Sequence, residues 1–267
     1  MIFVVRLVRR AVRTPRESVA LAMCVAVLAG AGAAGCAGAR EPARPAAPTA
    51  QVTAQVTAQV TAQVTAMSEA AHSVVRIRGY ASSCRKPLEA TGFVYAPERV
   101  MVNAHTVAGV DRDLEVVLGD GRRFAARVVA FDPEADAAVL RVPGLTARPL
   151  RLTETSITSA VVVGYRKGAT VPVELPARVR PDQTAESYDI YGRVRVSLRI
   201  HRFHGAAITP GMSGAPLVAD GDRVAGMVFA VDTDKADVGY ALTTAQFRAV
   251  ATAGRRATSA VPHDPCD

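Results

Sequence analysis

The sequence has little that points to a nucleotide, metal or nucleic-acid partner. Its 267 residues contain no Trp, only 5% aromatic residues and four Cys. No Gly-rich phosphate loop, no Cys-x-x-Cys pair and no aromatic platform beside basic residues is present. We therefore expect no cofactor, no metal ion and no nucleic-acid partner. Apolar residues make up 49% of the sequence, which suits a core built mainly from Val, Ala and Leu.

The net charge of +8 belongs mostly to the start of the chain. Residues 1–66 hold 7 Arg against 2 Glu, whereas residues 67–267 hold 25 Lys and Arg against 22 Asp and Glu. In the second part the basic residues are scattered or alternate, as in Arg193-Val194-Arg195. This pattern is typical of a solvated strand face and not of a nucleic-acid-binding stripe.

The N-terminus has the organisation of an export signal, with arginines leading into an apolar run from about residue 18 to residue 35. The run ends in Ala33-Ala34-Gly35-Cys36, which is similar to a bacterial lipobox, although lipoboxes usually begin with Leu. Lipidation of Cys36 is the favoured interpretation. Cleavage without lipid stays open, as does an uncleaved anchor helix, because about 17 apolar residues are near the lower limit for spanning a bilayer. Each alternative predicts export, and lipidation would hold the protein on the outer face of the cytoplasmic membrane.

A low-complexity segment separates the export signal from the folded part. Residues 37–66 are rich in Ala, Pro, Thr and Gln and include four Gln-Val-Thr-Ala repeats. So short a repeat indicates a spacer without a core of its own. The predicted organisation is an export segment over 1–36, a spacer over 37–66 and one domain over 67–267.

Two of the four cysteines, Cys84 and Cys266, lie near the two ends of the predicted domain. In an oxidising compartment such a pair is expected to form a disulfide. A catalytic thiol or a metal site is disfavoured, because neither Cys has a second Cys at ligand spacing. Closing a loop of this length stabilises a fold by up to about 5 kcal/mol in the chain-entropy model.

The domain has the pattern of an all-β fold. Short runs rich in β-formers predict strands over 74–80, 91–95, 114–118, 124–131 and 137–142, and then over 160–165, 171–179, 194–200, 215–218, 224–231 and 240–243. The turns Gly119-Asp120-Gly121 and Asp220-Gly221-Asp222 predict hairpins. Only residues 244–253 have a helical pattern. Two groups of about six strands and a closing helix indicate two packed antiparallel barrels.

Three segments carry the residues needed for nucleophilic acyl transfer, in the order His, Asp, Ser. The chemistry requires a hydroxyl, a base that takes its proton and a carboxylate that orients the base. His105 follows an apolar strand, Asp136 precedes another, and Ser213 lies in a turn bounded by Gly211 and Gly214.

These segments resemble the His, Asp and Ser blocks of the HtrA branch of the trypsin-like serine peptidases. Over about residues 73–266 the chain is similar to the actinobacterial MarP-like acid-resistance proteases. The matching elements include residues 73–78, Cys84 followed by residues 88–94, and the late Cys266. The resemblance implies two six-stranded Greek-key barrels and an endopeptidase that acts on envelope proteins or peptides, with a role in stress or acid resistance.

Carried over by position, the resemblance implies that His105 is the general base, Asp136 orients it and Ser213 is the nucleophile. The backbone N–H groups of Gly211 and Ser213 would form the oxyanion hole. Gly205 to Thr209 and the strand near residue 229 would line the primary substrate pocket. The pocket residues named on this basis are Ala207, Ile208, Val228, Phe229 and Ala230. None of them is acidic, which favours apolar or small substrate side chains over Lys or Arg.

The serine turn departs from the family pattern at two positions. Met212 stands where the family usually has Asp or Asn, and Ala215 stands where it has a second Gly. The added Cβ of Ala215 could distort the oxyanion hole. The four transmembrane helices that precede the MarP-like protease domain and a PDZ-like segment also have no counterpart in this sequence. These departures leave a second hypothesis, a peptide-binding protein that keeps the peptidase scaffold with little turnover.

His201 and His204 are a possible metal pair. Residues three apart on a strand point to opposite faces, so the two rings are not expected to share a ligand. A structural role is the favoured interpretation.

Overall fold

The computed structural model describes residues 3–4 and 69–263, and every statement about structure below concerns these residues. The spacer, Cys36 and Cys266 lie outside them, as does the export segment apart from two residues. Within the described ranges no helix has the length and apolar character needed to cross a bilayer.

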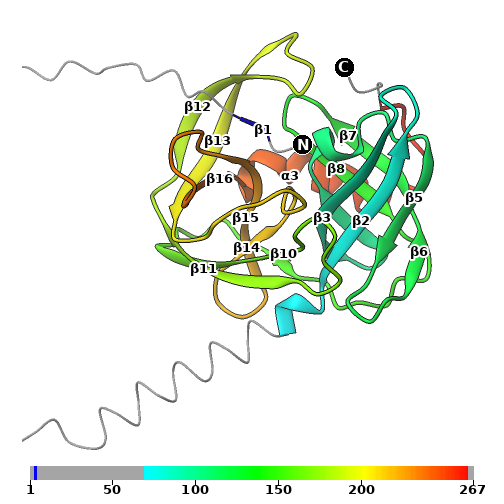
Figure 1. Cartoon of the computed structure of the whole chain (residues 1–267), viewed down its shortest axis with the longest axis horizontal. Helices are drawn as coiled ribbons and strands as arrows, with labels where there is room; N and C mark the ends of the chain where they lie inside the picture. Colours follow the sequence, from blue (N-terminus) through cyan, green and yellow to red (C-terminus); the bar gives the residue numbers. More distant parts are fainter. Residues whose placement is uncertain (1–2, 5–68, 264–267) are drawn as a thin grey trace, which may run out of the picture. The chain divides into compact units, whose positions relative to one another are not determined.

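The first sheet lies in the first half of the domain and is antiparallel throughout (Figure 1). Its strands are β2 (Val74–Ala81), β3 (Lys86–Ala96), β4 (Arg99–Val102), β5 (Arg112–Val117), β6 (Arg123–Ala125), β7 (Arg127–Asp132) and β8 (Ala137–Arg141). Their order in the sheet is β6-β5-β2-β3-β4-β8-β7. A one-turn helix, α2 (Ala104–Val107), follows β4.

The two ends of this sheet meet at Ala126. Strands β6 and β7 are separated by this residue alone, yet β6 pairs with β5 and β7 pairs with β8. The Ala126 N–H donates to Leu114 O on β5 at 2.9 Å. The sequence predicted a single strand over 124–131; it is instead bent, so that one half closes the barrel against the other edge. Counted as one bent strand, β6 and β7 complete a six-stranded barrel.

The second sheet contains the remaining strands. They are β1 (Phe3–Val4), β9 (Arg151–Leu152), β10 (Ser159–Gly164), β11 (Val173–Val179), β12 (Gln183–Tyr188), β13 (Arg195–His204), β14 (Pro216–Val218), β15 (Arg223–Val231) and β16 (Val238–Thr243). Strand β16 pairs with both β13 and β15, so six strands close into a ring in the order β15-β14-β10-β11-β13-β16. Short β1 and β9 add to β15 in parallel, and β12 forms a hairpin with β13.

Alternating burial explains why the sequence pattern identified most strands. Along β13, Val196, Leu198 and Ile200 are buried, whereas Arg195 and Arg199 between and beside them are exposed. Strand β12 was not predicted, because its sequence Gln-Thr-Ala-Glu-Ser-Tyr has a single fully buried position. Both predicted hairpin turns are present: Gly121 N–H donates to Leu118 O, and Ala219 N–H donates to Arg223 O.

The predicted C-terminal helix is confirmed as α3 (Thr244–Gly254). The Thr243 side chain caps its start by accepting the Gln246 N–H, and the buried face carries Phe247, Val250 and Ala251. The helix packs on β7 and β8 of the first sheet and on β13, β15 and β16 of the second. It therefore joins the two barrels (Figure 1).

Candidate active site

The pairing of β4 with β8 brings His105 and Asp136 together. These strands are antiparallel neighbours, with Val102 opposite Ala138. The residues that follow β4 therefore lie beside those that precede β8, although 31 positions separate His105 from Asp136 in the chain. His105 is in the turn of helix that begins directly after β4.

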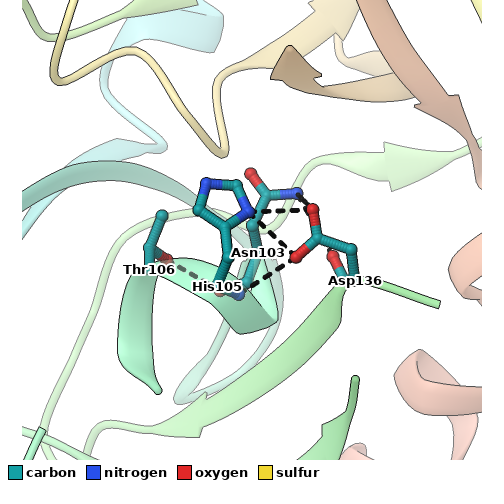
Figure 2. Close-up of polar contacts among 4 residues, drawn as sticks. All are labelled: Asn103, His105, Thr106 and Asp136. Carbon is teal, nitrogen blue, oxygen red and sulfur yellow. Dashed lines mark hydrogen bonds and ion pairs between the residues drawn. The ribbon is translucent and has the colours of Figure 1, made fainter. Parts of the chain in front are cut away.

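The imidazole of His105 is bound by the carboxylate of Asp136 (Figure 2). Nδ1 lies 2.9 Å from Oδ2 and 3.0 Å from Oδ1, and the His105 backbone N–H donates to Oδ1 at 3.0 Å. The side chains are 3% and 8% exposed. An ionised carboxylate can only accept hydrogen bonds, so Nδ1 carries the proton and the lone pair of the ring lies on Nε2. This is the tautomer that a general base at Nε2 requires.

Asn103 supports the same carboxylate, a role that the sequence analysis did not assign. Its side chain is fully buried, and Nδ2 lies 3.2 Å from Asp136 O and 3.4 Å from Oδ2 (Figure 2). The Thr106 hydroxyl in turn donates to Asn103 O at 2.7 Å. In the sequence, Asn103 is a single amide side chain between an apolar strand and His105. Its partner Asp136 can be identified only when the pairing of β4 with β8 is known.

The backbone of Asp136 is held in the left-handed region, with φ of 48°. Non-Gly residues seldom adopt this conformation, which costs about 1 to 2 kcal/mol and is found at functional sites. Asp132 stabilises the preceding turn, because its Oδ1 accepts the N–H groups of Glu134 and Ala135 at 3.0 and 2.9 Å. The loop thus turns the Asp136 side chain toward α2.

Ser213 lies in a turn between two positions, 211 and 214, that only glycine can occupy. Gly211 and Gly214 have φ values of +96° and +87°. A Cβ on Gly211 would lie 2.5 Å from Lys167 N, and one on Gly214 would lie 2.0 Å from Thr91 O. The turn is therefore wedged between backbone segments, where any side chain at either glycine would clash.

The serine turn is fixed to the first barrel. Ser213 O accepts the N–H of Thr91, on β3, at 2.9 Å. A Cβ on Gly214 would lie 3.7 Å from Val102 Cγ2, so the turn passes close to the end of β4, three residues before His105. Ser213 itself is 5% exposed. The three residues from distant parts of the sequence thus gather at the junction of the barrels.

A family model described as a trypsin-like peptidase domain matches residues 90–227, which include all three of these residues. The chain belongs to the trypsin-like peptidase family. This confirms the family resemblance and the fold predicted from the sequence.

The relatives of this chain include curated serine proteases. The chain is 41% identical over 177 residues to "Serine protease Rv3671c" of Mycobacterium tuberculosis, covering 65% of this chain and 44% of that protein. It is 28% identical over 162 residues to a probable periplasmic serine endoprotease, DegP-like, of Chlamydia muridarum, covering 56% of this chain and 29% of the relative. The chain thus spans less than half the length of these relatives.

Solved structures of trypsin-like proteases superpose on the described domain. The active form of the Rv3671c protease from M. tuberculosis superposes with a TM-score of 0.71 at 33% identity, covering 88% of this chain and 99% of that one. The HtrA-type protease AlgW with a tripeptide superposes with a TM-score of 0.62 at 22% identity, covering 73% and 64%. The second likeness concerns the fold alone.

The two unusual residues of the peptidase turn have side chains in the core of the second barrel. Met212 and Ala215 are both fully buried and belong to the cluster that contains Phe203 and Leu217. The Ala215 methyl lies against Gly164, where an added Cβ would be only 2.8 Å away. The extra methyl group is thus accommodated in the core of the second barrel. Its effect on the oxyanion hole stays a prediction.

Most of the predicted pocket residues are buried in hydrophobic clusters. Ile208 and Val228 pack with Met212, whereas Phe229 and Ala230 belong to the cluster shared by the two barrels. Ala207 is the exposed member of the five. Val228 adjoins the serine turn, since it accepts the Gly214 N–H and donates to Ala215 O, each at 2.8 Å. The pocket assignment remains a prediction.

The described residues hold no group of three or more His, Cys, Asp or Glu side chains arranged for a metal ion. His201 is 7% exposed, and burial lowers the pKa of its imidazole, with the nearby Asp182 opposing that shift. The structural role expected for His201 and His204 stays a prediction.

Cys84 is disulfide-bonded, and its predicted partner Cys266 lies outside the described residues. The pairing of these two cysteines therefore stays a prediction.

Proposed function

We propose that this protein is an extracytoplasmic, membrane-attached serine endopeptidase that cleaves envelope proteins through an acyl-enzyme. The observation that carries the proposal is the buried pair of His105 and Asp136, with Nδ1 2.9 Å from Oδ2, beside a glycine-bounded turn that presents Ser213. Kinship with serine proteases supports the same reaction class. The resemblance to the MarP-like proteases extends the proposal to a role in envelope stress.

The proposed reaction begins when His105 Nε2 takes the proton of the Ser213 hydroxyl and Oγ bonds to the substrate carbonyl carbon. Asp136 stabilises the imidazolium that forms. The Gly211 and Ser213 N–H groups would hold the oxyanion; neither donates to a backbone oxygen within the described residues. The C–N bond then breaks, and the leaving amine takes the proton from His105. Water then gives a proton to His105 and bonds to the acyl carbon. The bond between that carbon and Ser213 Oγ breaks, and Oγ takes the proton back from His105.

The rival hypothesis of a peptide-binding protein with little turnover rested on Met212 and Ala215. Their side chains pack in the barrel core, which favours a serine turn that tolerates both residues. Burial of Met212 also argues for an apolar side chain there, because an unpaired carboxylate in the same cluster would carry a large desolvation cost.

A fluorophosphonate probe tests the proposed catalysis in the full-length protein. We expect the wild type to be labelled, Ser213→Ala to lose all labelling and His105→Ala to lose most of it. Ser156→Ala is the matched control, since Ser156 is an exposed serine of the same domain. Absence of labelling in the wild type between pH 5 and 9, or undiminished labelling of Ser213→Ala, would overturn the proposal.

Attachment is proposed to occur through lipid on Cys36, and the Cys84–Cys266 disulfide would form after export. A Cys36→Ser variant should move from the membrane fraction to the soluble extracytoplasmic fraction, with a mass that lacks the lipid. An unchanged membrane fraction for this variant would favour the anchor-helix interpretation instead.

A further inference from the structure

Thr91, a fully buried residue of β3, makes three contacts with the serine turn of the opposite barrel. Its N–H donates to Ser213 O at 2.9 Å and its hydroxyl donates to Gly211 O at 2.8 Å. Its carbonyl oxygen occupies the space into which a side chain on Gly214 would project. One residue of the first barrel thus binds the carbonyl groups on both sides of Met212.

The direction of the Thr91 hydroxyl is determined by its second partner. Tyr165 N–H donates to Thr91 Oγ1 at 2.9 Å in a buried position. A hydroxyl has a single hydrogen, and the Tyr165 amide can only donate, so the Thr91 hydrogen goes to Gly211 O. The hydroxyl therefore sets the orientation of the peptide that joins Gly211 to Met212. The Met212 N–H, on the other side of that peptide, donates to Thr209 O at 3.1 Å.

The peptide that precedes Gly211 is held in a similar way. Pro210 O accepts the Lys167 N–H at 2.7 Å. The peptide is trans, as all described peptides are, and the N–H of a trans peptide points opposite to its C=O. The Gly211 N–H is consequently directed away from Lys167. This is the orientation that leaves it available to an oxyanion.

The loop that carries Lys167 is itself braced by the first barrel. Arg76 Nη1, on β2, donates to Ala169 O at 2.8 Å, and Glu89 Oε2, on β3, accepts the Gly168 N–H at 2.7 Å. The peptide after Gly211 is therefore held directly by Thr91 on β3. The peptide before Gly211 is held by the Lys167 loop, which β2 and β3 brace.

We infer that the Thr91 hydroxyl is a positioning group that keeps the Gly211 N–H aligned as an oxyanion-hole donor. The inference rests on the proposed serine peptidase function. Without the hydroxyl, Gly211 O and Tyr165 N–H would both lose a partner in a buried place, and rotation of the peptide at Gly211 would regain one. Regaining a partner in this way moves the Gly211 Cα, at which the two peptides meet, and so shifts the Gly211 N–H from the position that the transition state needs. Thr91 acts through this peptide and touches neither the substrate nor the Ser213 hydroxyl.

The test compares Thr91→Val, which removes the hydroxyl at nearly constant shape, with Thr91→Ser, which keeps it. Loss of a complete oxyanion donor costs about 10²- to 10³-fold in kcat, so we expect misalignment in Thr91→Val to lower kcat by about 10- to 100-fold. KM should change less than about twofold, because the hole acts in the transition state. Thr91→Ser should retain kcat within about threefold, and the pH profile should not move, since the His105–Asp136 pair is untouched.

Inhibitor binding separates positioning from a general structural defect. A peptidyl aldehyde forms a hemiacetal whose oxygen uses the hole, whereas the corresponding peptidyl alcohol forms no adduct. Thr91→Val should weaken the aldehyde by the factor lost in kcat and leave the alcohol unchanged. A loss confined to KM, equal losses in Thr91→Ser and Thr91→Val, or undiminished kcat in Thr91→Val would each overturn the inference. Failure of the proposed function is distinct, because the wild type would then not react with the fluorophosphonate probe.

Arg76→Met provides a second variant if Thr91→Val does not fold. It removes the guanidinium that holds Ala169 O, and we expect a loss of kcat in the same direction, with aldehyde binding weakened in parallel. Arg123→Met is the control, because Arg123 is an exposed arginine of the same barrel that pairs with Glu115 at 3.4 Å. Equal kcat in the two arginine variants would contradict the bracing of the loop.

Discussion

Gly164 and Ala215 face each other inside the second barrel, and a Cβ added to Gly164 would lie 2.8 Å from that of Ala215. The same added atom would lie 3.5 Å from Met212 Cε. The space that Gly164 leaves is therefore filled by the two side chains that distinguish this serine turn. The departures from the family pattern are compensated within the core of the second barrel.

This relationship predicts compensation between the two positions. Gly164→Ala should lower the free energy of unfolding by about 1 to 3 kcal/mol, because the core has no room for the methyl group. Adding Ala215→Gly should recover most of that loss, and Ala215→Gly alone should leave probe labelling unchanged. Urea unfolding of the two single variants and the double variant measures the coupling. Strictly additive effects would show that the two methyl groups do not compete for one space.

Asn103 should matter for catalysis through the carboxylate of Asp136. Asn103→Ala removes a buried donor to that residue, and we expect kcat/KM to fall by about tenfold while the fold persists. Asn103→Asp should be worse, because it places a second carboxylate beside Asp136. Steady-state kinetics on a peptide ester checks the order. Activity of Asn103→Asp equal to that of the wild type would contradict the assigned role.

His201 should make the fold less stable in mild acid. Burial lowers the pKa of its imidazole below the ordinary value of 6.5, so between that value and the lower folded pKa the unfolded chain binds more protons. The free energy of unfolding should therefore fall as the pH drops below about 6.5 and be insensitive to this group above it. The groups around it include Asp182, whose own pKa is lowered by a hydrogen bond from Arg199.

A non-titrating variant isolates this contribution. His201→Gln should show a shallower loss of unfolding free energy between pH 7 and 5 than the wild type, as measured by urea unfolding at each pH. Parallel curves for the two proteins would assign the acid sensitivity to other groups.

The N-cap of α3 should contribute measurably to stability, because this helix joins the barrels. Thr243→Ala removes the acceptor of the Gln246 N–H and should cost about 1 kcal/mol. Thr243→Ser keeps an acceptor and should cost less. Thermal unfolding separates the two, and equal losses would assign the effect to packing of the Thr methyl group.

The sequence by itself determined the all-β class, the closing helix and the order of the His, Asp and Ser segments. Period-two burial, turn residues and the local pattern after residue 243 are short-range signals, and they identified strands such as β13 and the helix α3 correctly. Strand β12 escaped detection, because its exposed edge position requires few apolar residues.

Only the tertiary structure decided what surrounds the serine turn. Three contacts are examples: Thr91 with Gly211, Asn103 with Asp136, and Gly164 with Ala215. The partners in these pairs lie 33 to 120 positions apart in the chain. No local pattern marks such pairs, because each partner alone is compatible with an ordinary strand or turn. Packing of one barrel on the other brings Thr91 to Gly211. The pairing of β4 with β8 brings Asn103 to Asp136, and the interior packing of the second barrel brings Gly164 to Ala215 and buries Met212.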